Sequence, residues 1–345
     1  IIYSFSKNLN FISILSLIGT YSLNLIVISL FTAPAIYILR KSKKEIAVCI
    51  FLLLLPIIFF AHGNFQKKQF KKKELEKLPY TIRIIGSNIS LERFNNKIET
   101  EEVINELISL SSPKLNKKIF FIWPEGIIPN TYQNEVFLYA DIFNKNFNEN
   151  HLIGLGITKN QLENNKNQFY NSFSVFDNKL NLIKSYSKIK LVPFGEFLPL
   201  ENILKKLGLR KISFGYESFS KGKDRKLLSI ESNKFSFIPL ICYEIIYSGN
   251  INKEEYRTSF IINISEDGWF GNSIGPHQHF AHGVFRSIEE GKNVIRSTNN
   301  GISAFIDVNG RVISHLESTQ RGVIEITKYK KFNETLFSKF GNKIF

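Results

Sequence analysis

Two long stretches without charged side chains dominate the N-terminal part of the chain. One runs from Asn8 to Leu39 and the other from Ile46 to Gln66. A helix needs roughly 20 such residues to cross the hydrocarbon core of a bilayer. We therefore expect a membrane region at residues 1–66, with transmembrane helices at about 18–39 and 46–63. A signal peptide is the alternative for the first stretch, but it lacks a small-residue cleavage site and the second stretch follows it closely. Buried core helices are the alternative for both.

Basic clusters border the apolar stretches. Residues 40–44 read RKSKK, and residues 67–73 read KKQFKKK. The first cluster favours a cytoplasmic loop, so the remaining chain is expected on the other side of the membrane, since long domains cross largely regardless of charge. We interpret residues 67–79 as a basic juxtamembrane linker in contact with anionic headgroups, with a merely solvated linker as the alternative.

From Tyr80 onward, short runs rich in β-branched and aromatic residues alternate with helical or loop stretches. The runs that predict strands are residues 80–89, 118–125, 151–158, 235–244 and 259–265. Residues 98–110 place apolar side chains at mostly helical spacing, which predicts an amphipathic helix between two strands.

Two further segments, residues 171–189 and 302–317, have the pattern of β-hairpins. The second contains Asn309-Gly310, which favours a type I′ turn. Together with the strands and the helix, the hairpins indicate a mixed α/β domain at residues 80–328, followed by a C-terminal segment at 329–345.

Charge and composition narrow the possible partners. The 345 residues include 45 Lys plus Arg against 30 Asp plus Glu, which gives a formal net charge of +15. Such an excess suits nucleic acid or an anionic membrane surface. Because much of it flanks the apolar stretches, we expect a membrane and no nucleic acid as partner. The sequence has no glycine-rich phosphate loop, so nucleotide binding is unsupported.

The cysteines and histidines do not form a metal-binding pattern. The two cysteines, Cys49 and Cys242, lie in very different surroundings and belong to no CxxC motif. His277, His279 and His282 are close in sequence, but the first two do not share a helical face and no further ligand is obvious. We therefore expect no metal and no cofactor, and assign these histidines to packing and hydrogen bonding.

Three polar residues stand where apolar strands end, the position at which α/β folds expose reactive side chains. Glu125 follows the run IFFIWP, Lys188 lies in SYSKIKL, and Cys242 directly follows the run FSFIPLI. A partly desolvated Glu125 would have a raised pKa and suit general base catalysis. A nearby lysine would favour the thiolate of Cys242. Glutamate, lysine and cysteine are the base, electrostatic stabiliser and nucleophile that acyl transfer requires.

Each of the three residues also has an ordinary interpretation. Glu125 could be a solvated loop residue. Lys188 and Lys190 alternate with Ile189 and Leu191, which predicts that the two lysines point the same way while the apolar pair packs inward, and Lys188 could be an ordinary surface lysine. Cys242 could be a small buried apolar residue. The ensemble favours the catalytic interpretation over these alternatives.

Five segments resemble those of apolipoprotein N-acyltransferases, the membrane members of the nitrilase superfamily. They are WPEGIIP, YSKIKLVPFGEFLPL, ICYEIIY, NISEDGWFGNSIGPHQHF and IRSTNNGISAFID. The likeness runs from about Gly19 to Phe345. It implies a nitrilase-type αββα sandwich preceded by transmembrane helices, within a larger membrane protein. The resemblance implies further membrane helices before this chain and one after residues 329–345, in keeping with a sequence that begins at Ile1 and contains no methionine.

The resemblance assigns roles to individual positions. The family's catalytic glutamate falls on Glu125, its lysine on Lys188 and its nucleophile on Cys242. Glu196, Tyr243 and Glu244 match positions that hold the lysine and shape the substrate pocket. The chain departs from the family pattern at Glu266, where an asparagine is usual, and in its first strand, which lacks the usual glutamine. An added carboxylate at 266 could perturb neighbouring pKa values.

The resemblance also implies a reaction. A phospholipid donates an acyl chain to Cys242, and the resulting thioester is attacked by the amine of a diacylglyceryl-modified N-terminal cysteine on an apolipoprotein. The expected place is the bacterial inner membrane, in a multi-pass protein with its catalytic domain on the periplasmic side. Residues 204–219 are expected to cover the site and admit the chains. One rival interpretation is a membrane-tethered nitrilase-like amidase that hydrolyses small amides or nitriles. Another is a non-catalytic domain that only binds lipoproteins.

Overall fold

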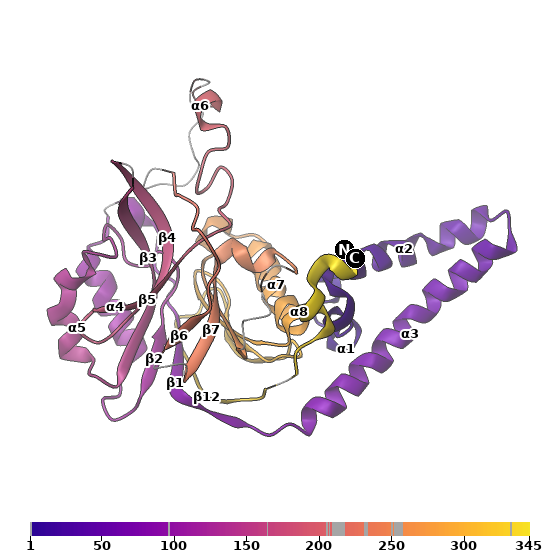
Figure 1. Ribbon diagram of the computed structural model, residues 1–345, viewed down its shortest axis with the longest axis horizontal. Coiled ribbons are helices and arrows are strands. Elements are labelled where there is room, and N and C mark those ends of the chain that lie inside the picture. Colours follow the sequence, from indigo (N-terminus) through magenta and orange to yellow (C-terminus); the bar gives the residue numbers. More distant parts are fainter. Residues whose placement is uncertain are drawn as a thin grey trace.

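The computed structural model describes residues 2–95, 97–163, 165–204, 206, 208, 218–230, 234–249, 251, 258–331 and 333–345. Most of the segment 204–219, for which a covering role is expected, lies outside these residues. The described chain forms two six-stranded sheets, a set of flanking helices and a long helical hairpin that extends away from them (Figure 1).

The first sheet has the strand order β12-β1-β2-β3-β4-β5. Its strands are β1 (Glu76–Gly86), β2 (Ile119–Ile122), β3 (His151–Glu163), β4 (Lys166–Phe176), β5 (Leu182–Ser187) and β12 (Gly322–Tyr329). Strands β1, β2 and β3 are parallel, and the outer pairs are antiparallel. The predicted strand–helix–strand progression and the first hairpin are therefore confirmed.

The second sheet has the strand order β11-β10-β9-β8-β7-β6, with β7, β8 and β9 parallel. Its strands are β6 (Leu228–Ile230), β7 (Phe235–Ile241), β8 (Phe260–Glu266), β9 (Asn293–Asn299), β10 (Ser303–Ile306) and β11 (Val312–Leu316). The hairpin of β10 and β11 was predicted, but the type I′ turn was wrong, because only Gly310 of the Asn309-Gly310 pair has a positive φ, of 79°. The pairing of β10 and β11 also contains a bulge, between Phe305 and Ile306, which shifts the register of the two strands next to the turn.

The two sheets pack face to face with helices on both outer sides, which is the αββα sandwich. Phe120 and Ile122 from the first sheet meet Phe237 and Ile262 from the second in one buried cluster. Helices α4 (Thr100–Ser111) and α5 (Ala140–Asn146) cover the first sheet, and α7 (Gly275–Glu290) covers the second (Figure 1). Because the central strands are covered on both faces, β2, β8 and β9 are buried along their whole length and not only at alternate positions.

Short helical elements connect or end these layers. They are η1 (Ile2–Phe5), α1 (Leu9–Ile12), η2 (Leu91–Asn95), η3 (Val136–Tyr139), α6 (Glu201–Leu204), η4 (Cys242–Ile246), η5 (Gly268–Phe270), α8 (Leu336–Phe340) and η6 (Gly341–Ile344). Three of them, η2, η4 and η5, lie next to the site described below.

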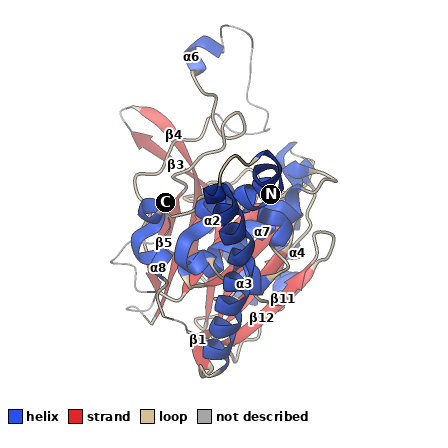
Figure 2. Ribbon diagram, turned by 90° about the vertical axis from the view of Figure 1, so that its right-hand side faces the viewer, coloured by secondary structure: helices blue, strands red, loops and turns tan. Residues whose placement is uncertain are grey.

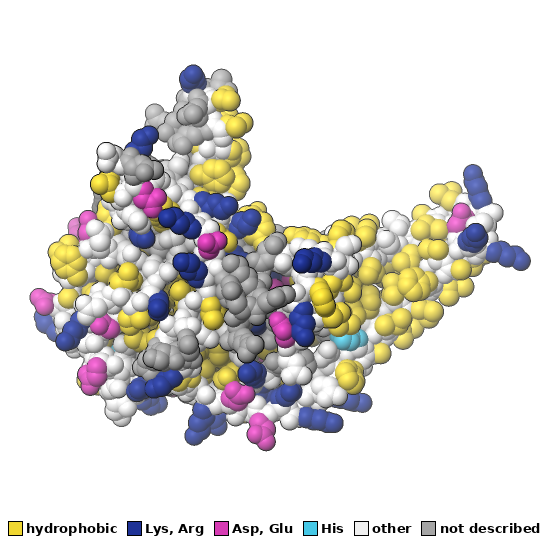
Figure 3. Space-filling model, viewed as in Figure 1, with side chains coloured by type: hydrophobic (Ala, Val, Ile, Leu, Met, Phe, Trp, Pro, Cys, Tyr) yellow, Lys and Arg dark blue, Asp and Glu magenta, His cyan; other side chains and the backbone are white. Residues whose placement is uncertain are grey.

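Helices α2 (Leu15–Leu39) and α3 (Lys43–Lys71) form the hairpin, and both are long and apolar enough to cross a membrane. Only 17% of the most apolar window of α2 and 22% of that of α3 is buried, which is too little for core helices of a soluble domain. Apolar side chains cover the visible face of the hairpin and basic side chains gather at its tip (Figure 3). Helix α3 is longer than predicted, because the lysines at 67–71 continue it instead of starting a linker.

Polar contacts attach both helices to the sandwich. Helix α2 breaks at Gly19, and the N–H of Thr20 at the start of the next turn donates to Oε1 of the buried Glu289 at 2.6 Å. Lys330 Nζ donates to the carbonyl oxygens of Phe70 and Lys71 at the end of α3. Viewed along the hairpin, α2 and α3 lie in front of α7 and the second sheet (Figure 2).

Candidate active site

Glu125 lies in a buried turn that follows β2. Its carboxylate accepts hydrogen bonds at Oε1 from Asn171 Nδ2 at 2.7 Å and from Lys188 Nζ at 3.3 Å, and at Oε2 from the N–H of Glu266 at 2.9 Å. Burial raises the pKa of Glu125, and the nearby carboxylate of Glu196 adds to the rise, while Lys188 opposes it. The net effect is a raised pKa, which suits a group that must take up a proton near neutral pH.

Lys188 is an almost fully buried cation, with only 1% of its surface exposed. Its Nζ lies 2.9 Å from Glu196 Oε1 and 3.3 Å from Glu125 Oε1. Burial alone would lower the pKa of Lys188, but the two carboxylates outweigh it and hold the pKa well above its usual value. The prediction that Lys190 points the same way was wrong. Strand β5 ends at Ser187, so alternation does not extend past it, and Lys190 is exposed.

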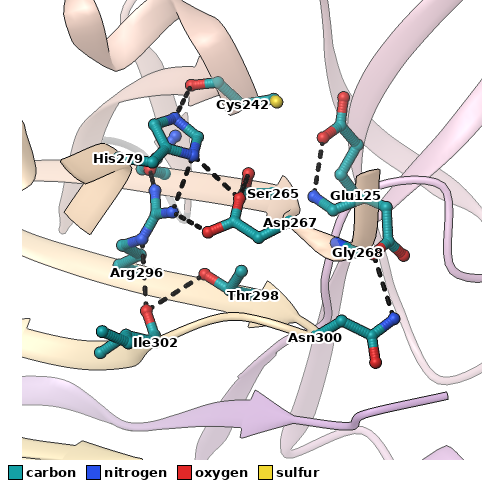
Figure 4. A network of polar contacts seen from close by, with 12 residues as sticks. Glu125, Cys242, Ser265, Asp267, Gly268, His279, Arg296, Thr298, Asn300 and Ile302 are labelled. Atoms are coloured by element: carbon teal, nitrogen blue, oxygen red, sulfur yellow. Dashed lines mark hydrogen bonds and ion pairs between the residues drawn. The ribbon is translucent and has the colours of Figure 1, made fainter. Parts of the chain in front are cut away.

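Cys242 stands at the turn between β7 and the short helix η4. Its backbone has a φ of 48°, a left-handed value that non-glycine residues rarely adopt and that persists only where the surroundings impose it. Burial raises the pKa of the Cys242 thiol, and Glu125 raises it further, while Lys188 lowers it. The thiol is therefore protonated at rest in spite of the lysine, and its ionisation requires a base. In Figure 4 the sulfur points away from His279, toward the side on which Glu125 lies.

Glu196 and Asn171 join the lysine to the glutamate. Glu196 Oε1 accepts hydrogen bonds from both Lys188 Nζ and Asn171 Nδ2, at 2.9 and 2.7 Å, and its Oε2 accepts one from the N–H of Val192 at 2.9 Å. Asn171, in β4, also donates to Glu125, so one amide holds two carboxylates in place. Asn171 was not predicted from the sequence, since a polar residue within an alternating strand gives no distinctive signal.

Glu244 ties the loop after Lys188 to the turn that carries Cys242. It is fully buried. Its Oε1 accepts from Tyr186 Oη, Ile189 N and Lys190 N, and its Oε2 accepts from Ile241 N, all at 2.8–3.2 Å. Arg225 lies 3.5 Å from Oε1 and balances the charge. Tyr243, the other residue expected to support the site, packs its ring edge-on against Tyr247.

A second network supports Cys242 from below (Figure 4). His279 Nδ1 lies 2.8 Å from Asp267 Oδ1, and its Nε2 lies 3.2 Å from the carbonyl oxygen of Cys242. Arg296 Nη2 lies 2.8 Å from Asp267 Oδ2, and Ser265 donates to the same carboxylate at 2.6 Å. Burial would raise the pKa of Asp267, but Arg296 and His279 lower it below its usual value. The network fixes the backbone of Cys242.

No group of three His, Cys, Asp or Glu side chains within the described ranges is arranged to hold a metal ion. Of the histidines considered for zinc, His279 belongs to the network above and His282 Nδ1 lies 2.9 Å from Tyr3 Oη. His277 is exposed. The hydrogen-bonding contacts of His279 and His282 match the expectation, whereas the exposed His277 is not packed into the domain.

The carboxylate of Glu266, the departure noted in the sequence, does not face Glu125. It forms a buried ion pair with Arg93 and accepts further hydrogen bonds from Asn299, Asn300 and the N–H of Gly268. The expected perturbation of nearby groups is thus offset by a partner cation that was not predicted.

The chain is similar to several known proteins. Residues 120–327 match the model of the carbon-nitrogen hydrolase family. The apolipoprotein N-acyltransferase of Brucella melitensis biotype 1 is 29% identical over 90% of this chain and 59% of its own length. That of Wigglesworthia glossinidia brevipalpis is 31% identical over 94% of this chain and 64% of its own length. The chain thus spans about three-fifths of the curated relatives it matches.

Among solved structures, a CN-hydrolase superfamily protein from Xanthomonas campestris, with an arsenic adduct in its active site, shares the fold. It is 13% identical, with a TM-score of 0.50, and the alignment covers 73% of this chain and 90% of that protein. The resemblance inferred from the sequence motifs is confirmed, as is the αββα sandwich. With a family model that matches more than half of its residues, the chain belongs to the carbon-nitrogen hydrolase family.

Proposed function

We propose that this chain is the catalytic part of an apolipoprotein N-acyltransferase. In this proposal an acyl chain passes from a phospholipid to Cys242 and then to the N-terminal diacylglyceryl-cysteine of an apolipoprotein. The observation that carries the proposal is the contact of Lys188 with Glu125 beside the Cys242 turn, in a domain attached to two exposed apolar helices. Similarity to proteins named apolipoprotein N-acyltransferase supports the choice of donor and acceptor.

In the first half-reaction Glu125 takes the proton of the Cys242 thiol, and the sulfur attacks the ester carbonyl of the phospholipid. Two N–H groups of Lys188 are directed at Glu196 and Glu125, which leaves the third to stabilise the oxyanion of the tetrahedral intermediate. The C–O bond then breaks, and the proton on Glu125 passes to the departing alkoxide. A lysophospholipid and an acyl thioester on Cys242 result.

In the second half-reaction the free amine of the lipoprotein's N-terminal cysteine attacks the thioester carbonyl. Glu125, again a carboxylate, accepts a proton from the attacking amine. The C–N bond forms and the C–S bond breaks, so that an amide and the Cys242 thiolate are produced, and the thiolate recovers the proton from Glu125. Both half-reactions use the same three side chains, as expected of a ping-pong cycle.

Both substrates are anchored in lipid, which gives the helical hairpin a purpose. Withdrawing an acyl chain from a bilayer costs about 0.8 kcal/mol per CH₂, so a catalytic site held at the membrane surface avoids most of that cost. The basic tip at residues 40–44 favours the cytoplasmic side. The sandwich, attached at the opposite ends of α2 and α3, then lies on the periplasmic side of the bacterial inner membrane, as part of a multi-pass protein.

The proposal predicts phospholipid-dependent acylation of a lipopeptide. The protein in vesicles, supplied with a phospholipid of one acyl composition and a synthetic diacylglyceryl-cysteine peptide, is expected to add one acyl chain to the peptide's α-amine, as measured by mass spectrometry. Cys242→Ala should give no product, because no thioester can form. Cys49→Ala is the matched control and should retain activity, since Cys49 lies in α3 with its thiol directed at the carbonyl of Ala33.

Release of ammonia from small amides, with no acylated peptide from either the native protein or Cys49→Ala, would contradict the proposal. That outcome would identify a membrane-tethered amidase.

A further inference from the structure

Arg93, in η2, is a fully buried arginine that lies next to the turn carrying Glu125. Its Nε and Nη2 donate to the carbonyl oxygen of Gly126, the residue that directly follows Glu125, at 3.4 and 3.3 Å. Its Nη1 donates to the carbonyl oxygens of Ile89 and Ser90 at 3.4 and 3.1 Å. The Arg93 guanidinium therefore connects the loop that follows β1 to the turn that carries Glu125.

The same guanidinium forms an ion pair with Glu266, at the end of β8. Both side chains are almost completely shielded from solvent, so the pair is buried on both sides. Oε2 of Glu266 accepts from Arg93 Nη2 and from Asn299 Nδ2. Oε1 accepts from Gly268 N at 2.8 Å and from Asn300 Nδ2 at 3.2 Å. In Figure 4, Gly268 and Asn300 lie on the same side of the site as Glu125.

Glu266 also touches Glu125, but through its backbone. Its N–H donates to Glu125 Oε2 at 2.9 Å, while Oε1 of Glu125 faces Asn171 and Lys188. The pair thus approaches Glu125 from two directions, by the carbonyl of Gly126 on one side and by the N–H of Glu266 on the other. A guanidinium has five donors in a planar fork, so Arg93 alone can contact the three backbone carbonyl oxygens and the Glu266 carboxylate.

We propose that Arg93 and Glu266 are a positioning pair for Glu125, which hold its turn against the end of β8 and keep the local charge balanced around it. The inference rests on the proposed role of Glu125 as general base. Neither residue is assigned a contact with substrate. The pair acts through the orientation of one carboxylate and through the electrostatic potential at that carboxylate.

The charge logic makes opposite predictions for the two members. The titratable groups that face Glu125 are Lys188, Glu196 and Cys242, and the pair itself adds no net charge to them. Loss of Arg93 leaves the Glu266 carboxylate unpaired, and a second negative charge raises the pKa of Glu125. Loss of Glu266 leaves the guanidinium unpaired, and a positive charge lowers it.

Alkylation of Cys242 by iodoacetamide tests this without any lipid substrate. The rate is measured against pH, and peptide mass spectrometry separates Cys242 from Cys49. The midpoint of this pH–rate profile is expected to be higher than that of the native protein in Arg93→Met and lower in Glu266→Gln, each by on the order of one pH unit. The double variant, which is again neutral, should return to within a few tenths of a unit of the native midpoint.

A shift of both single variants in the same direction, or slower alkylation with an unmoved midpoint, would overturn the proposal, because a purely structural pair would produce those results. If both single variants fail to unfold cooperatively, Arg93→Lys and the double variant decide. Both keep the charge balance, so a displaced midpoint in either would overturn it as well.

Glu125→Gln separates this inference from the proposed function. It is expected to remove the Glu125-dependent limb of the profile. An unchanged profile in that variant would contradict the role of Glu125 itself. A changed profile in Glu125→Gln, combined with native midpoints in both single variants, would contradict only the positioning pair.

Discussion

Replacing Lys188 with methionine is expected to slow acyl transfer by about two to three orders of magnitude and to destabilise the sandwich. Methionine has a similar length but no charge, so Glu125 and Glu196 would face each other across a buried site without the ammonium that now lies 3.3 and 2.9 Å from them. Removal of one partner from a buried ion pair costs about 3–5 kcal/mol. Loss of an oxyanion donor lowers the rate of the chemical step by about 10²–10³-fold.

Lys190→Met provides the matched control for this prediction. Lys190 is two residues away but exposed, and it contacts Glu244 through its backbone N–H, which the substitution preserves. Its activity and its apparent Tm in detergent should match those of the native protein. Equal effects of the two substitutions would show that the loss in Lys188→Met reflects general damage to this loop and not loss of the buried ammonium.

Replacing Glu125 with glutamine is expected to separate activity from stability. The amide is not basic, so the chemical step should slow by about 10²–10⁴-fold. The fold should lose about 1–3 kcal/mol, because the new NH₂ group faces another donor at either oxygen position. The cost stays below that of Lys188→Met, because the buried ammonium keeps Glu196 as its ion-pair partner. Single-turnover acylation of Cys242 and thermal unfolding, measured on the same preparation, check both parts.

The control for Glu125→Gln is Glu101→Gln, on the exposed side of α4. It removes the same charge at a distance from the site and should leave the acylation rate unchanged. A Glu125→Gln protein that acylates at the native rate would contradict the assignment of Glu125 as the base.

Several parts of this arrangement follow from the sequence because they depend on local patterns. The strand that ends before Glu125, the strand that delivers Cys242 and the two apolar helices all have signals within a few residues of themselves. Even so, local rules failed at particular points. Alternation did not place Lys188 and Lys190 together, because β5 ends at Ser187.

Asn171 and Arg93 could not be predicted from the sequence for a different reason. Asn171 reaches Glu125 from 46 positions away, and Arg93 reaches Glu266 from 173 positions away. Such contacts arise only when the two sheets are packed, and neither residue belongs to a motif. The sequence showed that Glu266 stands where the family usually has an asparagine, but it gave no sign that Arg93 compensates the charge.

The central claim, that Cys242 carries the acyl chain as a thioester, is tested most directly by peptide mapping of the protein after incubation with phospholipid alone. The account predicts an adduct with the mass of one acyl chain on the peptide containing Cys242, which neutral hydroxylamine removes and which is absent in Cys242→Ala. An unmodified Cys242 peptide in protein that acylates lipopeptide, or an adduct on another residue that survives in Cys242→Ala, would contradict it.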